Sequence, residues 1–270
     1  MSNQTYEKMW QDFGKGKKSY LGYKFEPTYR IGLTNYLREL LIIKFIDPQK
    51  EDVLLDCGCA AGKQLFALSK SIKAGYGTDI AQSFVDMADK HKQENNVENL
   101  FFSQSDIEEM PFEDSFFDKI ICGEVLEHVF DKDIALGELG RVLKTGGTLL
   151  ITVPNMNADA TLWGRFLRLI KVRKFTPIDV FSKEELVKHG DAHVREFSKK
   201  SLSQWLEKND YEVKVIKSAS FIDGPRWFEF LLKVLLHIKI IQKAIIGLEK
   251  FLTNINLFFG RQLIIKAIKK

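Results

Sequence analysis

The sequence predicts an α/β fold, in which a doubly wound and mostly parallel sheet is covered by helices on both faces. Between residues 53 and 153, short apolar segments alternate with segments of helical period, and this alternation is typical of parallel sheets. The first apolar segment ends in D-C-G-C-A-A-G, whose small residues let the backbone turn tightly and let a ligand approach it. The 270 residues, 45% of them apolar, suffice for one large domain.

The elements can be assigned in order along the chain. Residues 1–30 are rich in aromatic residues and glycines, and we expect an irregular arm there. Residues 31–46 carry apolar side chains at helical spacing, and Asp47-Pro48 ends this helix. The predicted strands are residues 53–57, 75–80, 100–104, 119–122, 148–153, 211–220 and 262–268. The predicted helices between them are residues 63–69, 82–93, 134–143 and 199–209.

The end of the helix at 134–143 and the segments after Pro154 need separate description. Lys144-Thr145-Gly146-Gly147 follows the helix at 134–143 and resembles a helix stop, with a cation and glycines at the end. After Pro154 the alternation gives way to a helix-like segment at 161–174. A second stretch, 225–259, is very apolar and largely helical in pattern.

Charge and cysteine content exclude several classes of protein. A net charge of +4 is too small to indicate a nucleic-acid partner. Cys57, Cys59 and Cys122 favour a reducing compartment without disulfides, and they lack the further ligands of a zinc site. The polar N-terminus does not resemble a signal peptide, and no apolar run reaches the roughly 18 residues that span a bilayer. We therefore expect a cytoplasmic protein without bound metal, and the oligomeric state stays open.

Three acids stand at the ends of predicted strands. Asp56 ends the first strand, Asp79 ends the second, and Asp106 follows the third. Ligands of parallel sheets bind at the carboxyl ends of the strands, where the acid after the second strand can accept both hydroxyls of a ribose. Asp106 can accept a hydrogen bond from an exocyclic amine, with Ile80 and Ile107 as apolar walls for a base. Together they predict a site for a nucleoside-bearing cofactor, although each acid alone could simply cap the next helix.

The end of the fourth predicted strand, Cys122-Gly123-Glu124, again has small residues that permit close approach. Cys122 and Gly123 are therefore counted among the cofactor candidates. A dehydrogenase that uses NAD is the alternative class, because the first turn and Asp79 would serve it too. The later segments S-D-I, L-E-H-V and R-V-L-K-T-G-G are not expected in that class.

Six segments together carry a resemblance to a known family. They are D-C-G-C-A-A-G, G-Y-G-T-D-I, S-D-I-E-E-M-P-F-E-D-S-F-F-D, G-E-V-L-E-H-V, R-V-L-K-T-G-G-T-L-L-I-T-V-P-N and H-V-R-E-F-S. The ordered set resembles class I S-adenosylmethionine-dependent methyltransferases, in the branch of the ubiquinone and menaquinone biosynthesis enzymes and their small-molecule relatives. The resemblance covers about residues 30–220 and the last strand. It implies a Rossmann-like sheet of seven strands whose last strand runs antiparallel.

The resemblance also implies roles for individual residues. The sequence departs from the family pattern D-x-G-x-G-x-G at Ala60, whose methyl group narrows the approach to the cofactor. The implied contacts with S-adenosylmethionine are Asp56, Gly58 and Gly62 for the methionine part, Asp79 for the ribose, and Asp106 and Ile107 for the adenine.

Candidate groups for the chemistry follow the fourth strand. A sulfonium donor already carries an activated methyl group, so an enzyme mainly aligns the acceptor, and a hydroxyl acceptor gains from a base. His128 is the candidate base because the ordinary pKa of histidine lies near neutrality. Glu124 and Glu127 are possible partners, and the alternative is that His128 only caps or packs the next helix. His193 and Arg195, with Trp163, are candidate acceptor contacts, although His193 and Arg195 could equally form a surface turn.

Two predicted helices are basic and amphipathic. Such helices suit an anionic membrane surface, but they more often cover a sheet and a substrate pocket. The segment 161–174 has apolar residues on one side and the cations Arg165, Arg168 and Lys171 on the other. In the later helix the apolar side carries Leu231, Val234, Leu235, Ile238, Ile241, Ile245 and Leu248, and most cations lie opposite, at Lys233, His237, Lys239, Lys243 and Lys250.

These observations predict a methyltransferase that acts on a small-molecule or lipid-linked acceptor, with oxygen as the favoured acceptor atom. It would be cytoplasmic, with an anionic membrane surface as a possible partner and no nucleic acid. The alternatives are methylation of carbon or nitrogen by the same fold, and a non-catalytic protein that binds the cofactor. The expected parts of the single domain are an arm and helix (1–48), a cofactor-binding core (49–155), a substrate cap (156–198), a closing helix and strands (199–224 and 260–270) and a helical insertion (225–259).

Overall fold

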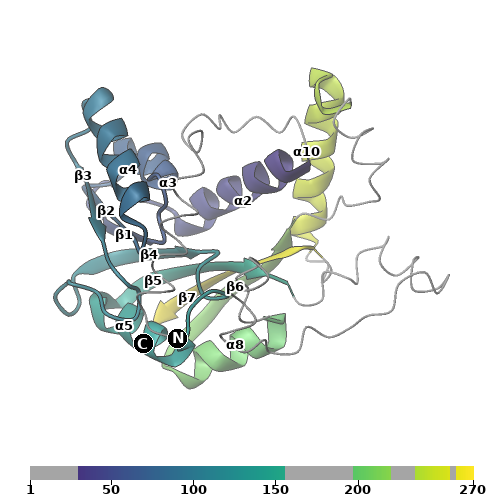
Figure 1. The fold of residues 1–270 in the computed structure, drawn as a ribbon. Helices are drawn as coiled ribbons and strands as arrows, with labels where there is room; N and C mark the ends of the chain where they lie inside the picture. Colours follow the sequence, from purple (N-terminus) through teal and green to yellow (C-terminus); the bar gives the residue numbers. More distant parts are fainter. Residues whose placement is uncertain (1–29, 156–196, 220–234, 256–259) are drawn as a thin grey trace, which may run out of the picture.

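The computed structural model describes residues 30–155, 197–219, 235–255 and 260–270. Its centre is a seven-stranded sheet of order β3-β2-β1-β4-β5-β7-β6 (Figure 1). Neighbouring strands are parallel except around β7, which runs antiparallel to both β5 and β6. The predicted fold class and its antiparallel last strand are therefore confirmed. The strands are β1 (Val53–Cys57), β2 (Ala74–Asp79), β3 (Leu100–Gln104), β4 (Phe117–Gly123), β5 (Leu143–Pro154), β6 (Tyr211–Ala219) and β7 (Gln262–Lys269).

Helices cover both faces of this sheet (Figure 1). Helices α2, α3 and α4 lie over one face, and α5 and α8 lie over the other. Helix α10 stands at the β6 end of the sheet, packed against α2 and β6. The helices are α2 (Arg30–Ile46), α3 (Lys63–Leu68, followed by the 3₁₀ turn η2, Ser69–Ser71), α4 (Gln82–Glu94), α5 (Lys132–Val142), α8 (Lys199–Lys208) and α10 (Lys239–Asn254).

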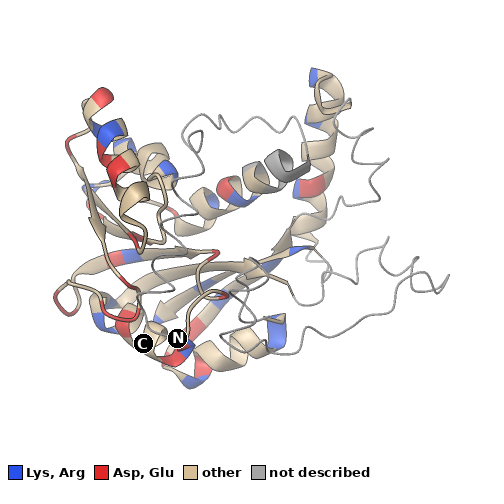
Figure 2. Ribbon diagram, viewed as in Figure 1, with Lys and Arg blue, Asp and Glu red and all other residues tan. Residues whose placement is uncertain are grey.

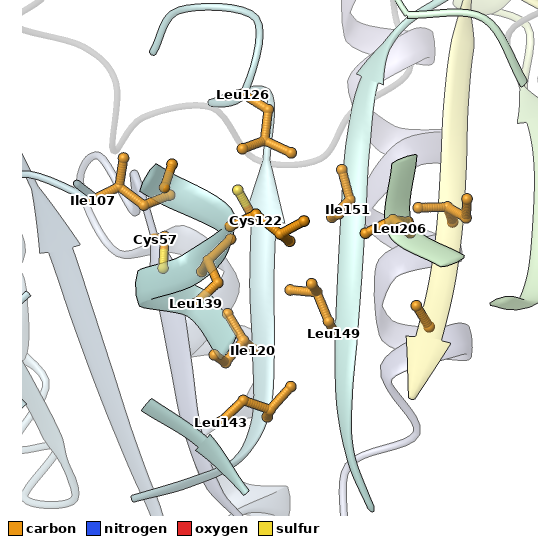
Figure 3. Close-up of a cluster of buried hydrophobic side chains, with 14 of the residues drawn as sticks. Cys57, Ile107, Ile120, Cys122, Leu126, Leu139, Leu143, Leu149, Ile151 and Leu206 are labelled. Carbon is orange, nitrogen blue, oxygen red and sulfur yellow. The ribbon is translucent and has the colours of Figure 1, made fainter. Parts of the chain in front are cut away.

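The side chains of each central strand alternate between two apolar clusters. Leu55 and Ile120 belong to the cluster beneath α5 and α8, part of which is drawn in Figure 3. Leu54 and Ile121 belong to the cluster beneath α2 and α3. Burial of each apolar side chain of this size contributes about 1.5–3 kcal/mol to the free energy of folding. The alternation of the strand therefore determines which residues face α5 and α8 and which face α2 and α3. Asp56 lies two residues after Leu54 and therefore faces α2.

The sequence Lys144–Gly147 does not end a helix, contrary to the prediction. Helix α5 ends at Val142, and Leu143 is already extended and pairs with Phe117 of β4. Pairing resumes at Thr148 after a shift of register, so the intervening residues form an irregularity within β5, with Gly146 at a φ of 76°. The glycines serve a bulge, where one strand has more residues than its partner.

Several predicted parts lie outside the described residues. They are most of the arm (1–29), most of the cap with its helix-like segment (156–196), the start of the helical insertion (220–234) and residues 256–259. Within the insertion, α10 confirms a helix. Of the helices in the described ranges, none has the length and apolar character to cross a membrane.

Candidate functional site

The turn between β1 and α3 has a left-handed backbone at three positions. Gly58, Ala60 and Gly62 have φ values of 67°, 45° and 77°. A Cβ atom on Gly58 would overlap the side chain of Val125, and one on Gly62 would lie 2.7 Å from the ring of Phe102. Glycine is therefore required at both positions by backbone conformation and by packing, in addition to any ligand.

Asp79, at the end of β2, joins this turn to the next one. Its Oδ2 accepts a hydrogen bond from the N–H of Ala60, and its Oδ1 accepts one from the N–H of Ala81, both at 2.9 Å. Burial raises the pKa of Asp79, and these two N–H groups oppose the rise. A carboxylate oxygen accepts more than one hydrogen bond. Asp79 is thus held in one orientation and keeps acceptor capacity for a ligand.

Asp56 lies beneath α2, close to further charged groups. It is 2% exposed, and within the described residues its Oδ2 has no hydrogen-bond partner. Burial raises its pKa well above the ordinary value, and the charges of Glu39 and Asp79 add to the rise. Burial also raises the pKa of Glu39, against the opposing charges of Arg38 and Lys63. A cation bound beside Asp56 and Glu39 would stabilise the ionised form of both carboxyl groups.

Arg38 contributes the opposite charge at the same place. Its guanidinium lies 3.8 Å from Glu39 and 3.6 Å from Glu124, and its Nε has no partner within the described residues. The Oε1 atom of Gln64 is likewise buried without a partner there. Buried polar groups are normally paired, so one unsatisfied donor and two acceptors, including Asp56 Oδ2, mark a place for a ligand. An amino-acid group, with an ammonium and a carboxylate, fits these partners.

The sequence did not single out Arg38 and Glu39. They are adjacent residues of a largely apolar helix, and their proximity to Asp56 arises only when α2 packs over β1. The available signal was that two adjacent charged residues, with Lys44 further along, interrupt the apolar pattern of residues 31–46, but a solvated helix face explains the same pattern.

Asp106 and Ile107 lie just beyond β3. Ile107 is 8% exposed, and Asp106 is half-buried with its Oδ1 accepting a hydrogen bond from the N–H of Glu108 at 2.9 Å. The N–H of Ser105 donates to the carbonyl of Asp79, which holds the ends of β2 and β3 together. The ends of the strands that carry Asp79 and Asp106 thus lie side by side, as predicted. One carboxylate oxygen of Asp106 is already hydrogen-bonded within its own turn.

Cys122 and Gly123 end β4 in different ways. The side chain of Cys122 is fully buried in the cluster beneath α5, so only its backbone can meet a ligand (Figure 3). Gly123 lies on the α2 side, where a Cβ would stand 3.5 Å from Gln64 and from Thr152. That distance is an ordinary contact, so Gly123 leaves free space beside the polar groups under α2. Ile80 is half-buried, and its carbonyl accepts a hydrogen bond from Gln104.

Glu124 is held by the neighbouring strands. It has a φ of 57°, and its carboxylate accepts a hydrogen bond from the hydroxyl of Thr152 in β5 at 3.2 Å. The amide nitrogen of Gln262, at the start of β7, lies 3.5 Å from the other oxygen of Glu124. Three elements, β5, β7 and α2 through Arg38, thus converge on one carboxylate.

Glu127 and His128 form the second part of this group. Glu127 is fully buried, and neither of its oxygens has a hydrogen-bond partner within the described residues. Burial raises its pKa well above the ordinary value, and the charge of Glu124 adds to the rise. The Nε2 atom of His128 lies 4.0 Å from Glu127. The structure therefore places all three sequence candidates in adjacent positions beyond β4.

Three candidates lie outside the described residues, namely Trp163, His193 and Arg195. Across the ranges that the structure describes, histidine, cysteine and acidic side chains form no group of three or more that could hold a metal ion.

Comparisons with known proteins bear on this site. A family model described as a methyltransferase domain matches residues 48–211. The uncharacterized methyltransferase YcgJ of Bacillus subtilis is 36% identical over 111 residues, which are 41% of this chain and 44% of that protein. The ubiquinone biosynthesis O-methyltransferase of Coxiella burnetii is 32% identical over 124 residues, 45% of this chain and 53% of that protein. The chain thus spans about half the length of these curated relatives.

Solved structures share the fold. The crystal structure of B. subtilis YcgJ superposes with a TM-score of 0.55 and 24% identity over 86% of this chain and 97% of that one. The geranyl diphosphate C-methyltransferase of Streptomyces coelicolor, solved with S-adenosyl-L-homocysteine, gives 0.56 and 14% over 86% and 78%. At these sequence identities, both comparisons show a shared fold and nothing about the reaction.

Proposed function

This chain belongs to the methyltransferase-domain family, and from that premise we propose that it transfers a methyl group from S-adenosylmethionine to a small-molecule or lipid-linked acceptor, with oxygen as the acceptor atom. The observation that carries the proposal is the arrangement at the ends of β1 and β2. Asp79 is fixed by two turn amides, while Asp56 is buried with one oxygen that has no hydrogen-bond partner in the part of the chain that the structure describes.

Oxygen is favoured by one relative and by the carboxylates beyond β4. The C. burnetii relative is named an O-methyltransferase of ubiquinone biosynthesis. Transfer to oxygen requires loss of a proton, and the group of Glu124, Glu127 and His128 beyond β4 supports the proposal because it holds side chains that can act as a base. Transfer to carbon or nitrogen by the same fold is the alternative.

We assign the cofactor contacts by the chemistry of each group. S-adenosylmethionine, when bound, supplies a sulfonium methyl group that passes to the acceptor's lone pair as the carbon–sulfur bond breaks. Asp79 accepts from the ribose hydroxyls, and Asp106 with Ile80 and Ile107 holds the adenine. Asp56 receives the ammonium and Arg38 the carboxylate of the methionine part. The turn of Gly58, Ala60 and Gly62, with the backbone of Cys122 and Gly123, lets the cofactor lie close to the strand ends.

The acceptor side of the site is assigned to residues beyond β4 and β5. His128 takes the acceptor proton, and the carboxyl group of Glu127, 4.0 Å from Nε2, stabilises the charge that the imidazole gains. Glu124, held by Thr152 and Gln262, faces the acceptor. We assign residues 156–198 as the cap over the acceptor, with Trp163, His193 and Arg195 as its contacts, because this segment follows directly from the carboxyl end of β5.

The compartment we propose is the cytoplasm, with peripheral attachment to the inner face of the membrane. Support for a reducing compartment comes from Cys57, Cys59 and Cys122, which are all free and buried.

Isothermal titration of the full chain with S-adenosylmethionine and S-adenosylhomocysteine tests the proposal. Asp79→Asn replaces one acceptor oxygen by a donor that opposes the N–H of Ala60 or Ala81. Since hydrogen bonds to charged groups contribute about 1.5–3 kcal/mol each, affinity should fall by at least tenfold. Asp86→Asn, at an exposed position of α4, is the matched control. Absence of binding by the unmodified protein would sink the proposal, and binding without turnover in a screen with labelled methyl groups would indicate a scaffold.

A further inference from the structure

Helix α10 exposes an apolar stripe along its length. Ile240 is 82% exposed, Phe251 59%, and Leu248 and Ile255 50% each. With Ala244 between them, these residues recur at intervals of three and four, so they share one face of the helix. Large apolar side chains gathered on one outer face indicate contact with another surface.

The side of α10 that packs against α2 and β6 is unusually polar for a buried helix face. The residues of α10 that are fully buried are Glu249 and Thr253, at 1% and 4% exposure, on the side packed against α2 and β6. Ile241 and Ile245, which the sequence assigns to the same apolar side as Leu248, are half-buried, whereas Leu248 faces outward. Apolar residues thus occupy the outer face in addition to the inner one. Core packing accounts only for the inner set.

The charges of α10 are arranged by sign. Lys239, Lys243 and Lys250 are exposed, and their spacing places them in one row along the edge of the apolar stripe. The single acid of α10, Glu249, is buried. Figure 2 shows this distribution, with basic segments along the helix and one acidic segment at the level of α2. The exposed face therefore combines apolar side chains with cations and carries no acid.

We propose that this face, the α10 stripe (Ile240, Leu248, Phe251 and Ile255) with its lysine row, binds an anionic phospholipid surface. The apolar side chains enter the boundary between headgroups and acyl chains, and the lysines pair with lipid phosphates. A second copy of this chain would leave the lysine row without acidic partners on α10, because Glu249 is buried. Lipid phosphate supplies the missing charge.

The use of this surface rests on the proposed function. Helix α10 packs against α2, which carries Arg38 and Glu39 at the assigned cofactor site. A bilayer on the outer face of α10 would therefore be separated from α2 by the width of one helix, about 10 Å, which the chain of a lipid-linked acceptor can span. Binding to lipid is measured without any methyl transfer, so the two ideas fail separately.

Vesicle sedimentation of the full chain tests the inference. Vesicles of phosphatidylcholine alone are compared with vesicles that also contain phosphatidylglycerol, at low and high salt. We expect binding to the anionic vesicles only, weakened by salt. Leu248→Ser with Phe251→Ser should lower the partition coefficient at least about tenfold, or about 1.4 kcal/mol. Ile134→Ser on α5 removes a side chain of similar exposure, 52%, and should leave binding unchanged.

A second pair of variants tests the lysine row. Lys243→Glu with Lys250→Glu should abolish the preference for anionic vesicles, whereas Lys73→Glu with Lys208→Glu changes the net charge equally at exposed positions elsewhere and should keep it. Equal effects of the two charge reversals, or no sedimentation with anionic vesicles, would overturn the inference. So would a dimer that Leu248→Ser with Phe251→Ser converts to monomers while no vesicle binding is seen. Cofactor titration of the same variants should be unchanged.

Discussion

Ala60 is the residue at which the glycine turn departs from what its backbone favours. Its φ of 45° lies in the left-handed region, which costs a residue with a Cβ about 1–2 kcal/mol. The N–H of Ala60 donates to Asp79, so this conformation also orients the carboxylate at the end of β2. The hydrogen bond from Ala60 to Asp79 therefore stabilises the strained backbone conformation and also orients the carboxylate of the candidate ribose site.

Ala60→Gly should stabilise the protein. Relief of about 1–2 kcal/mol is offset by about 0.4–1 kcal/mol from the greater freedom of glycine in the unfolded chain. We expect a net gain of up to about 1 kcal/mol in the free energy of unfolding, measured as a higher urea midpoint. Ala67→Gly makes the same chemical change at an exposed position of the right-handed helix α3 and should lower the midpoint. A lower midpoint for Ala60→Gly would show that its backbone is not strained.

Individual residues of the site differ in how far the sequence reveals them. The role of Asp79 can be predicted from the order of the elements, because the end of the second strand of such a sheet always lies beside the turn after the first strand. The roles of Arg38 and Glu39 cannot be predicted in this way, since nothing in the local sequence distinguishes a charged residue on the buried face of a helix from one on its exposed face. Their role depends on where α2 packs, and that is decided by Leu41 and Ile42, which are buried against the sheet.

Helix α5 and strand β5 show how one residue type serves two elements. Gly137 lies inside α5, and Gly146 lies in the irregular part of β5 at a φ of 76°. An added Cβ would meet no atom within 4 Å at either position. The difference between them is therefore purely one of backbone conformation. The sequence shows both glycines, but the interpretation of Gly146 as a helix stop was wrong because β5 begins directly after α5.

Gly137→Ala and Gly146→Ala should have opposite effects on stability. In a helix alanine is favoured over glycine by about 0.8–1 kcal/mol, so Gly137→Ala should raise the urea midpoint. At a positive φ the same change costs about 1–2 kcal/mol, so Gly146→Ala should lower it. The two variants control for each other, because each adds one methyl group in open space. Shifts in the same direction would contradict the conformational explanation.

Among the described residues, four buried carboxyl groups have pKa values that folding raises. Burial raises the pKa values of Glu39, Asp56, Asp79 and Glu127. A group whose pKa is higher in the folded state binds protons more tightly there, so its contribution to stability is present at low pH and is lost as pH rises through the raised value. The free energy of unfolding without ligand should therefore fall as pH rises above about 4, the ordinary range of these groups.

Cofactor charge should reverse this dependence. S-adenosylmethionine carries a sulfonium that S-adenosylhomocysteine lacks, and a cation favours ionised carboxyl groups. Between pH 5 and 7 the affinity for S-adenosylmethionine should rise more steeply than that for S-adenosylhomocysteine, by at most about tenfold per pH unit for each proton released. Titration in buffers of different ionisation enthalpy counts these protons directly. Asp56→Asn should lower the pH dependence of both affinities, because both ligands carry the ammonium, and Asp86→Asn should not. A ratio of the two affinities that does not change with pH would show that the sulfonium does not affect the ionisation of the buried carboxyl groups.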